Sequence, residues 1–427
     1  MQGLTRTTTL SLTLFSTPLW ADVHHVAPGQ SIQAVVDAAA DGDVIVLDSG
    51  LYVETVEVML KNISIRGAGS DNTVWEPASG AMLESTFSNL IVEGIAFEHG
   101  TGASTAGSTR GGALFIQSST IEIYDCSFYN NRSAGGGAVY LSNADAVVSG
   151  CRFDENYLTT GNTGGTTIFS NYATLDVYDS TFEENGWGGS GFAYGTVQVN
   201  NGYLYAANCY FNHNQSSATG FGLVNSSGVA GHCTFVDSVF HGNLIYDSSF
   251  KLLDSVFLSD QETPVENANR IFQSGSVEVA GCVLPTESEV LESTSTMPGA
   301  LNVVSWTPEF EVVNGYLVPQ IDTAIAAIAG SADNLYSPST IVAPITDLHG
   351  ELRDTPRSIG AIETTGAPAP SCPTDVDHNN RTDYMDLIAV LTHWGVADEP
   401  RNEDFNQDGF VDLHDLTTVL SNWGPCS

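Results

Sequence analysis

Short apolar stretches alternate with polar ones through the middle of the chain, and the pattern recurs as a gap-free repeat. In each copy, apolar or small residues occupy the places seven, five and two before an anchor, as at Ile121, Ile123 and Cys126 before Phe128. Such alternation predicts short strands that turn one face inward. The clear anchors are spaced by 25 and then 29 residues, with weaker copies on both sides. We register the repeat on Phe97, Phe128, Phe153, Phe182, Phe211, Phe240, Phe257 and Leu284.

Two polar places in the repeat predict the corners between strands. Three places before each anchor stands Gly, Asp or Asn, which are the residues that best tolerate a left-handed backbone. Three places after the clear anchors stands asparagine, where we expect a second corner for the same reason. These asparagines are Asn131, Asn156, Asn185, Asn214 and Asn243.

A single copy of the repeat is too small to bury its inward face, whereas stacked copies bury it together. Adjacent turns would then lie about 4.8 Å apart, with equivalent residues in ladders. The repeat therefore predicts an all-β parallel β-helix. A leucine-rich solenoid would need a leucine consensus that is absent here, and a β-propeller would need blades of about 40 residues.

Three segments resemble known β-helix proteins. Residues 26–58, VAPGQSIQAVVDAAADGDVIVLDSGLYVETVEV, are similar to the capping helix and first coil of the pectate-lyase-like superfamily. GGALF (111–115) and GGAVY (136–140) resemble surface repeats of bacterial passenger proteins, and residues 347–363 resemble the closing motif of choice-of-anchor Q β-helix proteins. The resemblance implies a right-handed parallel β-helix that carries any ligand in a groove along one flank.

The charge balance excludes several classes of partner. The chain has 12 basic and 50 acidic side chains, a formal net charge of −38. Nucleic acid and anionic membrane surfaces are therefore not expected as partners, because phosphate groups are held mainly by Lys and Arg. Hydrophobic residues make up 42% of the chain, which is enough for a core.

The N-terminus has the features of a cleaved secretory signal. Arg6 precedes an apolar stretch from Leu10 to Leu19, and Ala21 provides a small residue for cleavage. A disordered N-terminus is the alternative. No later segment has the length and apolarity of a membrane span. We therefore expect a secreted, extracellular or cell-surface monomer with a signal peptide (1–21), a β-helix domain (22–363), a linker (364–371) and a C-terminal module (372–427).

The C-terminal module contains two twelve-residue loops that lie 29 residues apart, each running into a helix that is apolar on one side. Oxygen-bearing side chains fall at places 1, 3, 5, 9 and 12, and place 7 would offer its backbone carbonyl. This EF-hand arrangement predicts two Ca²⁺ sites. The ligands are Asp375, Asp377, Asn379, Arg381, Asp383 and Asp386 in the first loop, and Asp404, Asn406, Asp408, Phe410, Asp412 and Asp415 in the second.

The duplicated loops and helices resemble a type I dockerin, which implies a cohesin-bearing scaffold as the partner. Places 10 and 11 carry Tyr384, Met385, Leu413 and His414 instead of the Ser/Thr that dockerins often have, so a calcium-stapled terminal tag is the alternative. Cys372 and Cys426 bracket the module, and we expect them to form a disulfide. The other cysteines fall on inward places of the repeat, where they act as small core residues.

Long loops between residues 99 and 222 recur at one side of the repeat and carry isolated arginines and aromatic residues that suit sugar rings and carboxylates. The candidate ligand-binding residues are Arg110, Arg132, Tyr157, Trp187 and Tyr194. No set of residues forms a recognisable catalytic site. Two interpretations remain open: a protein that acts on or binds extracellular polysaccharide, as a lyase, hydrolase or binding protein, and a non-catalytic adhesive β-helix. Surface loops without a ligand are the structural alternative for this flank.

Overall fold

The structure is a computed structural model that describes residues 21–427 with gaps. The gaps are 106, 160–163, 188–192, 216–218, 237–240, 259–266, 273–274, 285–293, 297–302, 305–309, 314–315, 320–345, 351–352, 354–359, 363–373, 375, 377–380, 383, 397–404, 406–409, 412, 423 and 426–427. The expected signal peptide (except Ala21), the linker and the Cys372–Cys426 pair lie outside the described residues.

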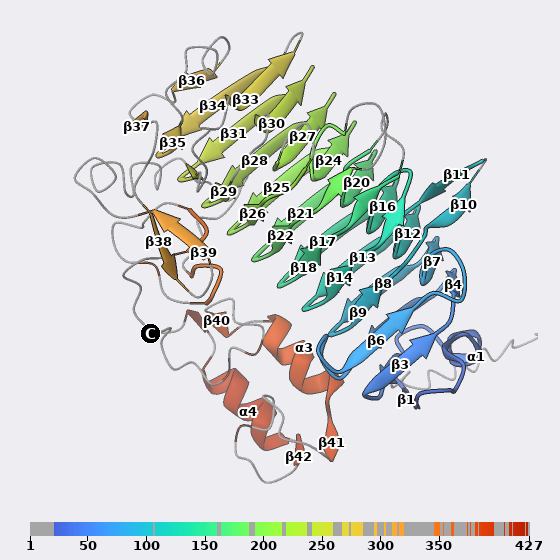
Figure 1. Ribbon diagram of the computed structural model, residues 1–427. Helices are drawn as coiled ribbons and strands as arrows, with labels where there is room; N and C mark the ends of the chain where they lie inside the picture. The colour runs from blue at the N-terminus through green and yellow to red at the C-terminus, as the bar shows by residue number, and fades with distance from the viewer. Residues whose placement is uncertain are drawn as a thin grey trace, which may run out of the picture.

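The body is a parallel β-helix, as the repeat predicts, in which the chain coils through three parallel sheets (Figure 1). Sheet A contains β1 (Val23–Val26), β2 (Val44–Leu47), β5 (Asn62–Arg66), β8 (Asn89–Glu93), β13 (Thr120–Tyr124), β17 (Asp145–Ser149), β21 (Thr174–Tyr178), β25 (Tyr203–Ala207), β28 (Ser227–Gly231), β31 (Ser249–Leu253), β34 (Ser276–Ala280) and β36 (Thr294–Thr296).

Sheet B follows sheet A within each turn, and sheet C follows sheet B after a longer connection. Sheet B contains β3 (Gly50–Val53), β6 (Thr73–Glu76), β9 (Ala96–Glu98), β14 (Ser127–Tyr129), β18 (Arg152–Asp154), β22 (Thr181–Glu183), β26 (Tyr210–Asn212), β29 (Thr234–Val236), β32 (Val256–Leu258), β35 (Val283–Leu284) and β37 (Val303–Val304). Sheet C contains β4 (Val56–Met59), β7 (Leu83–Thr86), β12 (Leu114–Gln117), β16 (Val139–Ser142), β20 (Ile168–Asn171), β24 (Val197–Asn200), β27 (Phe221–Val224), β30 (His241–Tyr246) and β33 (Asn267–Phe272).

Two hairpins and a small three-stranded sheet lie outside the three main sheets. The connections between sheets B and C carry the hairpin β10 (Ala103–Thr105) and β11 (Ser108–Arg110), and a three-stranded sheet of β15 (Arg132–Ser133), β19 (Tyr157–Leu158) and β23 (Gly186–Trp187). A further hairpin pairs β38 (Phe310–Val313) with β39 (Tyr316–Pro319).

An aromatic column inside sheet B confirms the anchors of the repeat up to Phe211. Phe128, Phe153, Phe182 and Phe211 are fully buried, and their rings stack 4.6–4.8 Å apart. The inward places before them are buried as expected, including Ile121, Ile123 and Cys126. Trp75 extends the column toward the N-terminus through its contact with Phe97.

The prediction of Phe240 as an anchor of the repeat is wrong. Phe235 pairs in register with Phe211 and stacks on both Phe211 and Phe257. Phe235 and Phe240 both follow apolar and small residues. Asn243 stands three places after Phe240, as the repeat requires of an anchor, and this spacing led to the choice of Phe240. The turns here are shorter than 29 residues, so the alignment without gaps placed the anchor five residues too late.

A ladder of buried asparagines crosses the turns just after sheet B, as the repeat predicts, but for a different physical reason. The left-handed residue is the one before each asparagine, for example Asn130 (φ 51°) before Asn131 and Glu155 (φ 50°) before Asn156. The side chains of Asn131, Asn156, Asn185 and Asn214 are buried, and each of the first three asparagines donates from its backbone N–H and its side-chain amide to the Oδ1 of the asparagine on the next turn, at 2.9–3.1 Å. Asn243 lies in β30, is also fully buried, and its Oδ1 accepts a bond from the Phe221 N–H at 2.9 Å.

The corner three places before each anchor is left-handed as predicted. Asp125 (φ 51°), Gly150 (φ 64°), Asp179 (φ 46°) and Asn208 (φ 53°) all occupy it. The corrected register adds His232 (φ 50°) to this column. Asp237, which the wrong anchor placed here, lies outside the described residues.

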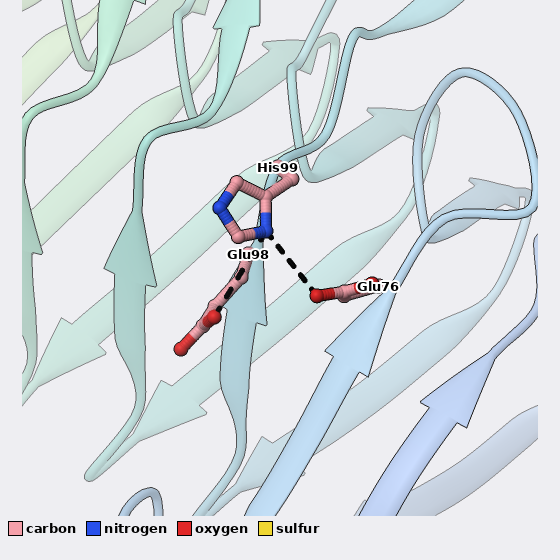
Figure 2. Close-up of side chains that lie close together, drawn as sticks. All are labelled: Glu76, Glu98 and His99. Atoms are coloured by element: carbon pink, nitrogen blue, oxygen red, sulfur yellow. Dashed lines mark hydrogen bonds and ion pairs between the residues drawn. The ribbon is translucent and has the colours of Figure 1, made fainter.

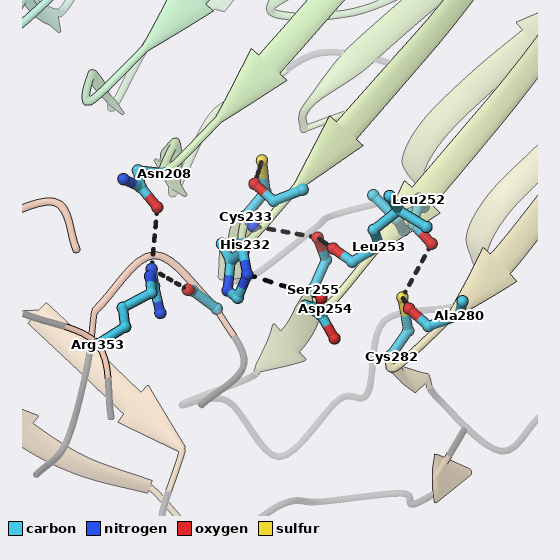
Figure 3. A network of polar contacts seen from close by, with 12 residues as sticks. Asn208, His232, Cys233, Leu252, Leu253, Asp254, Ser255, Ala280, Cys282 and Arg353 are labelled. Atoms are coloured by element: carbon cyan, nitrogen blue, oxygen red, sulfur yellow. Dashed lines mark hydrogen bonds and ion pairs between the residues drawn. The ribbon is translucent and has the colours of Figure 1, made fainter. Parts of the chain in front are cut away.

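Different segments cover the ends and the side of the β-helix. Helix α1 (Ile32–Ala38) is capped by Ser31 and by the Glu54 carboxylate, and buries Ile32 and Val36 against the first turns. The closing segment reaches the corner column through Arg353, whose Nη2 donates to Asn208 Oδ1 at 2.9 Å (Figure 3). Asn208 in turn donates to Asp179 Oδ1 at 2.8 Å, and burial raises the pKa of Asp179 to about 6.

The C-terminal module contains α3 (Tyr384–Thr392) and α4 (Leu413–Ser421), which pack together around Val390, Val411 and Val419. Four short strands join its halves crosswise: β40 (Arg381–Thr382) pairs with β43 (Gly424–Pro425), and β41 (Gly395–Val396) pairs with β42 (Phe410–Val411). Within the described residues, no helix is both long and apolar enough to cross a membrane.

The five cysteines of the repeat are buried, which confirms the expectation that they fill the core: Cys126, Cys151, Cys209, Cys233 and Cys282.

Candidate functional site

An open groove runs along the corner between sheets C and A, with a volume of about 800 Å³. It crosses several turns, so that each turn contributes a similar set of residues. Tyr172 and Tyr203 are its two aromatic residues, and their exposed fractions are 59% and 55%. The repeat predicts strands on both sides of this corner, but none of the loop residues selected from the sequence lies in it.

Left-handed backbone and small side chains shape the groove. Asn143, Tyr172, Asn201, Asn225 and Asp247 occupy one left-handed place on successive turns, with φ between 48° and 57°. The next place holds Ala173, Gly202, Ser226 and Ser248 among others, and these small residues keep the groove open. A bulky residue in the left-handed region is uncommon and costs about 1–2 kcal/mol. Tyr172 bears this cost with most of its side chain in solvent, so core packing does not explain its presence.

The groove offers hydrogen-bonding groups on rigid strands. Asp145 Oδ1 accepts from the Thr174 N–H at 2.7 Å, and Ser249 Oγ donates to Ser227 Oγ at 2.9 Å. The Ser226 and Ser248 hydroxyls instead donate to backbone carbonyls beside the groove and contribute to its walls. Alternating hydroxyls, amides and aromatic faces on fixed positions are suited to a polyhydroxylated ligand.

The groove carries acidic groups and no basic lining residue among those described. Asp145 and Asp247 line it. Asp176 lies two residues after Thr174 on the same outward face of β21, and burial together with the charge of Asp145 raises the pKa of Asp176 to about 6. One of its carboxylate oxygens is buried. Two neighbouring carboxyl groups therefore differ in their environments.

The loop flank beside sheet C brings the predicted arginines onto aromatic rings in two separate pairs. Arg110 Cζ lies 4.9 Å from the ring centroid of Tyr140, in an outward row with Phe115 and Phe169. Tyr140 and Phe169 are only 8% and 5% exposed. Arg110 therefore covers an aromatic row that is largely buried beneath the loops, and the ring of Tyr140 offers little face to a ligand.

The second pair is more open. Arg132 Cζ lies 5.7 Å from the ring centroid of Tyr157, and the two residues are paired in β15 and β19. The exposed Arg132 guanidinium also donates to Asn130 Oδ1 at 2.8 Å. Trp187 is in register with Leu158 in β23, but its side chain lies outside the described residues, and Tyr194 is half-buried.

The described parts of the two C-terminal loops close in the same way. Asp386 Oδ1 accepts from the Val376 N–H at 2.6 Å, and Asp415 Oδ1 accepts from the Phe405 N–H at 2.9 Å. Both carboxylates are fully buried. Each bond joins place 12 of a loop to place 2. Arg381 and Phe410 at place 7 each begin a short strand, and the other predicted calcium ligands lie outside the described residues.

The comparison with protein families agrees with the fold. A family model described as "Right handed beta helix region" matches residues 49–257. Metabotropic glutamate receptor-like protein R of Dictyostelium discoideum is 30% identical over 181 residues, which are 40% of this chain and 10% of that protein. The chain thus matches about a tenth of the length of this curated relative.

Two of the solved structures that match this chain have names that refer to polysaccharides. An alginate lyase from Paenibacillus sp. strain FPU-7 is 10% identical with a TM-score of 0.39, covering 67% of this chain and 99% of that one. A pectin methylesterase from carrot is 13% identical with a TM-score of 0.34, covering 68% of this chain and 90% of that one.

Proposed function

We propose that this protein binds an extracellular polysaccharide, which lies along the β-helix axis in the groove between sheets C and A. The observation that carries the proposal is the pair of exposed tyrosines, Tyr172 and Tyr203, in an open polar groove. Turns recur about every 4.8 Å, a distance similar to the length of one sugar residue in an extended chain. Successive sugars would therefore meet equivalent groups on successive turns.

The charge of the groove favours a neutral polysaccharide. Asp145 and Asp247 would accept hydrogen bonds from sugar hydroxyls but would repel a chain of ionised uronates. The net charge of −38 acts in the same direction. Arg132 over Tyr157 is the alternative point of contact for an acidic chain, so the two sites predict opposite preferences.

Hydrolysis is the second candidate function, and it rests on the Asp145 and Asp176 carboxyl groups. Glycoside hydrolysis needs one carboxyl group that is protonated and one that is ionised. Burial and the charge of Asp145 raise the pKa of Asp176 to about 6, which would let Asp176 act as the protonated group at mildly acidic pH. Release of reducing ends that Asp176→Asn abolishes would support hydrolysis, whereas binding without release supports the adhesive role.

Binding is tested by replacing each tyrosine with the residue that occupies the equivalent position on a neighbouring turn. Tyr172→Asn reproduces Asn143 and Asn201, which hold the same left-handed place on neighbouring turns. Tyr203→Thr reproduces Thr174 in the preceding strand. We expect each variant to lose at least tenfold in affinity on a glycan array while the melting temperature changes little.

Tyr129→Ala, an exposed aromatic residue of sheet B, serves as the matched control and should bind as the wild type does. A preference for acidic glycans that Arg132→Ala removes would place binding on the loop flank instead. Absence of binding to any neutral or acidic glycan would refute the proposed function.

We further propose that the protein is secreted and that its C-terminal module binds two Ca²⁺ ions. The place-12 carboxylates of Asp386 and Asp415 fit hard-cation loops, because each is buried and already holds the start of its own loop. Calcium would balance these carboxylates and fix the loops that lead into α3 and α4. Cys372 and Cys426 would join the ends of the module, and its dockerin-like pattern suggests a cohesin-bearing scaffold. Pull-down with cohesins of different specificity, with and without chelator, tests this attachment.

A further inference from the structure

Two glutamates and a histidine meet at the outer edge of sheet B, far from the groove residues in the sequence. Glu76 ends β6 and Glu98 ends β9, and the preceding residues Trp75 and Phe97 are paired in register. The two carboxylates therefore occupy the same place on successive turns. His99 follows directly and adopts a left-handed backbone (φ 62°), at the corner where other turns carry Asn130 or Glu155.

The three side chains converge on one point, as Figure 2 shows. His99 Nδ1 lies 3.3 Å from Glu76 Oε1 and 4.0 Å from Glu98 Oε2. The three potential ligand atoms all lie within 4.8 Å of one another. The side chains of Glu76 and Glu98 are 33% and 29% exposed, and that of His99 is 47% exposed, so an ion could enter from solvent. Within the described part of the chain, this is the one such group of three.

The donor set identifies the class of cation. Like charges on adjacent strands repel each other, and a cation between Glu76 and Glu98 would reverse that interaction. An imidazole nitrogen favours zinc-type transition ions over Ca²⁺ or Mg²⁺, which prefer all-oxygen ligands. Zinc with ligands at about 2.1 Å needs ligand atoms about 3.4 Å apart in a tetrahedron. The distances in the structure would therefore need only small side-chain adjustments.

We propose that Glu76, Glu98 and His99 form a surface site for a divalent transition-metal ion of the zinc class, with water completing the coordination. The strands hold both carboxylates in place, and the left-handed backbone of His99 brings its ring between them. The bound ion would join the turns that contain β6 and β9. This site is separate from the two predicted calcium loops and from the groove between sheets C and A.

The chain supplies its own matched control. His25 Nδ1 lies 3.5 Å from Asp48 Oδ1, and both side chains are exposed, at 62% and 48%. This pair has the same chemistry as His99 with Glu76 but belongs to no three-residue group among the described residues. His25→Gln therefore removes a histidine–carboxylate pair without affecting the proposed site.

The test is isothermal titration of the full chain with Zn²⁺ in millimolar Ca²⁺, which keeps the C-terminal loops saturated with their own cation. We expect one zinc equivalent that His99→Gln and Glu76→Gln weaken at least tenfold and His25→Gln leaves unchanged. Co²⁺ should give a visible absorption band that is lost in the same two variants. Circular dichroism in chelator confirms that the variants fold. Absence of zinc binding by the wild type, or undiminished binding by His99→Gln, would overturn the proposal.

Discussion

Replacing Asn156 by leucine tests whether the buried asparagine ladder holds successive turns together. Asn156 Nδ2 donates to Phe128 O at 2.9 Å and to Asn185 Oδ1 at 3.0 Å. Its Oδ1 accepts from both the backbone N–H and the side-chain amide of Asn131, at 3.1 and 3.0 Å. Leucine has a similar volume but replaces none of these four bonds.

The expected loss follows from the number of bonds and their burial. At about 1 kcal/mol net for each bond, Asn156→Leu should lower the free energy of unfolding by about 4 kcal/mol. We expect the loss of unfolding free energy to be no smaller than this figure, because the Asn131 N–H would remain buried after its acceptor is removed. Asn156 is fully buried, so water cannot replace its amide without opening the turn.

Urea unfolding followed by circular dichroism measures the change, with Asn89→Ala as the control. Asn89 lies in an exposed row on β8, where it contacts Asn62 and Thr120. We expect this control to lose less than about 1 kcal/mol, because exposed polar contacts exchange readily with water. Equal losses in the two variants would refute the view that buried hydrogen bonds in the ladder stabilise the stacked turns.

Three other predictions concern the core, the closing segment and the C-terminal module. Phe182→Ala should cost about 3–5 kcal/mol in unfolding experiments, because its ring is fully buried between Phe153 and Phe211; an effect below 1 kcal/mol would contradict the column. Burial raises the pKa of Asp179 from 3.8 to about 6, so this group's stabilising contribution is complete below pH 3.8 and is lost as the pH rises through 6. Asp179→Asn should therefore flatten the stability profile between pH 4 and 6 and raise stability at pH 7.5 by about 1–3 kcal/mol; an unchanged profile would show that Asp179 is not the group responsible. Chelation of Ca²⁺ should increase hydrogen exchange in α3 and α4 but not in sheets A–C, and Asp375→Ala with Asp404→Ala should do so even with Ca²⁺ present; equal protection with and without the ion would contradict the calcium proposal.

The local repeat was sufficient to predict the β-helix, the inward places and one of its corners. Each turn stacks on a nearly identical neighbour, so the environment of Phe153 or Cys151 is mostly set by the same place one turn away. In the described parts of the two C-terminal loops, Asp386 and Asp415 make equivalent bonds. The calcium ligation itself remains a prediction.

Features that depend on the length of a turn, or on contacts between side chains of different turns, could not be predicted from the repeat alone. The choice of Phe235 over Phe240 depends on a shortened turn, which a fixed spacing cannot represent. The groove at Tyr172 and Tyr203 arises from small residues on neighbouring turns, and the burial of Tyr140 depends on how Arg110 packs over it. Glu76 precedes the first registered copy of the repeat and His99 follows the weak anchor Phe97, and only the register of β6 and β9 brings them together. The sequence by itself determined what a single turn needs to form, while the tertiary structure decided which side chains of different turns meet, because stacking distance and register are properties of the assembled coil.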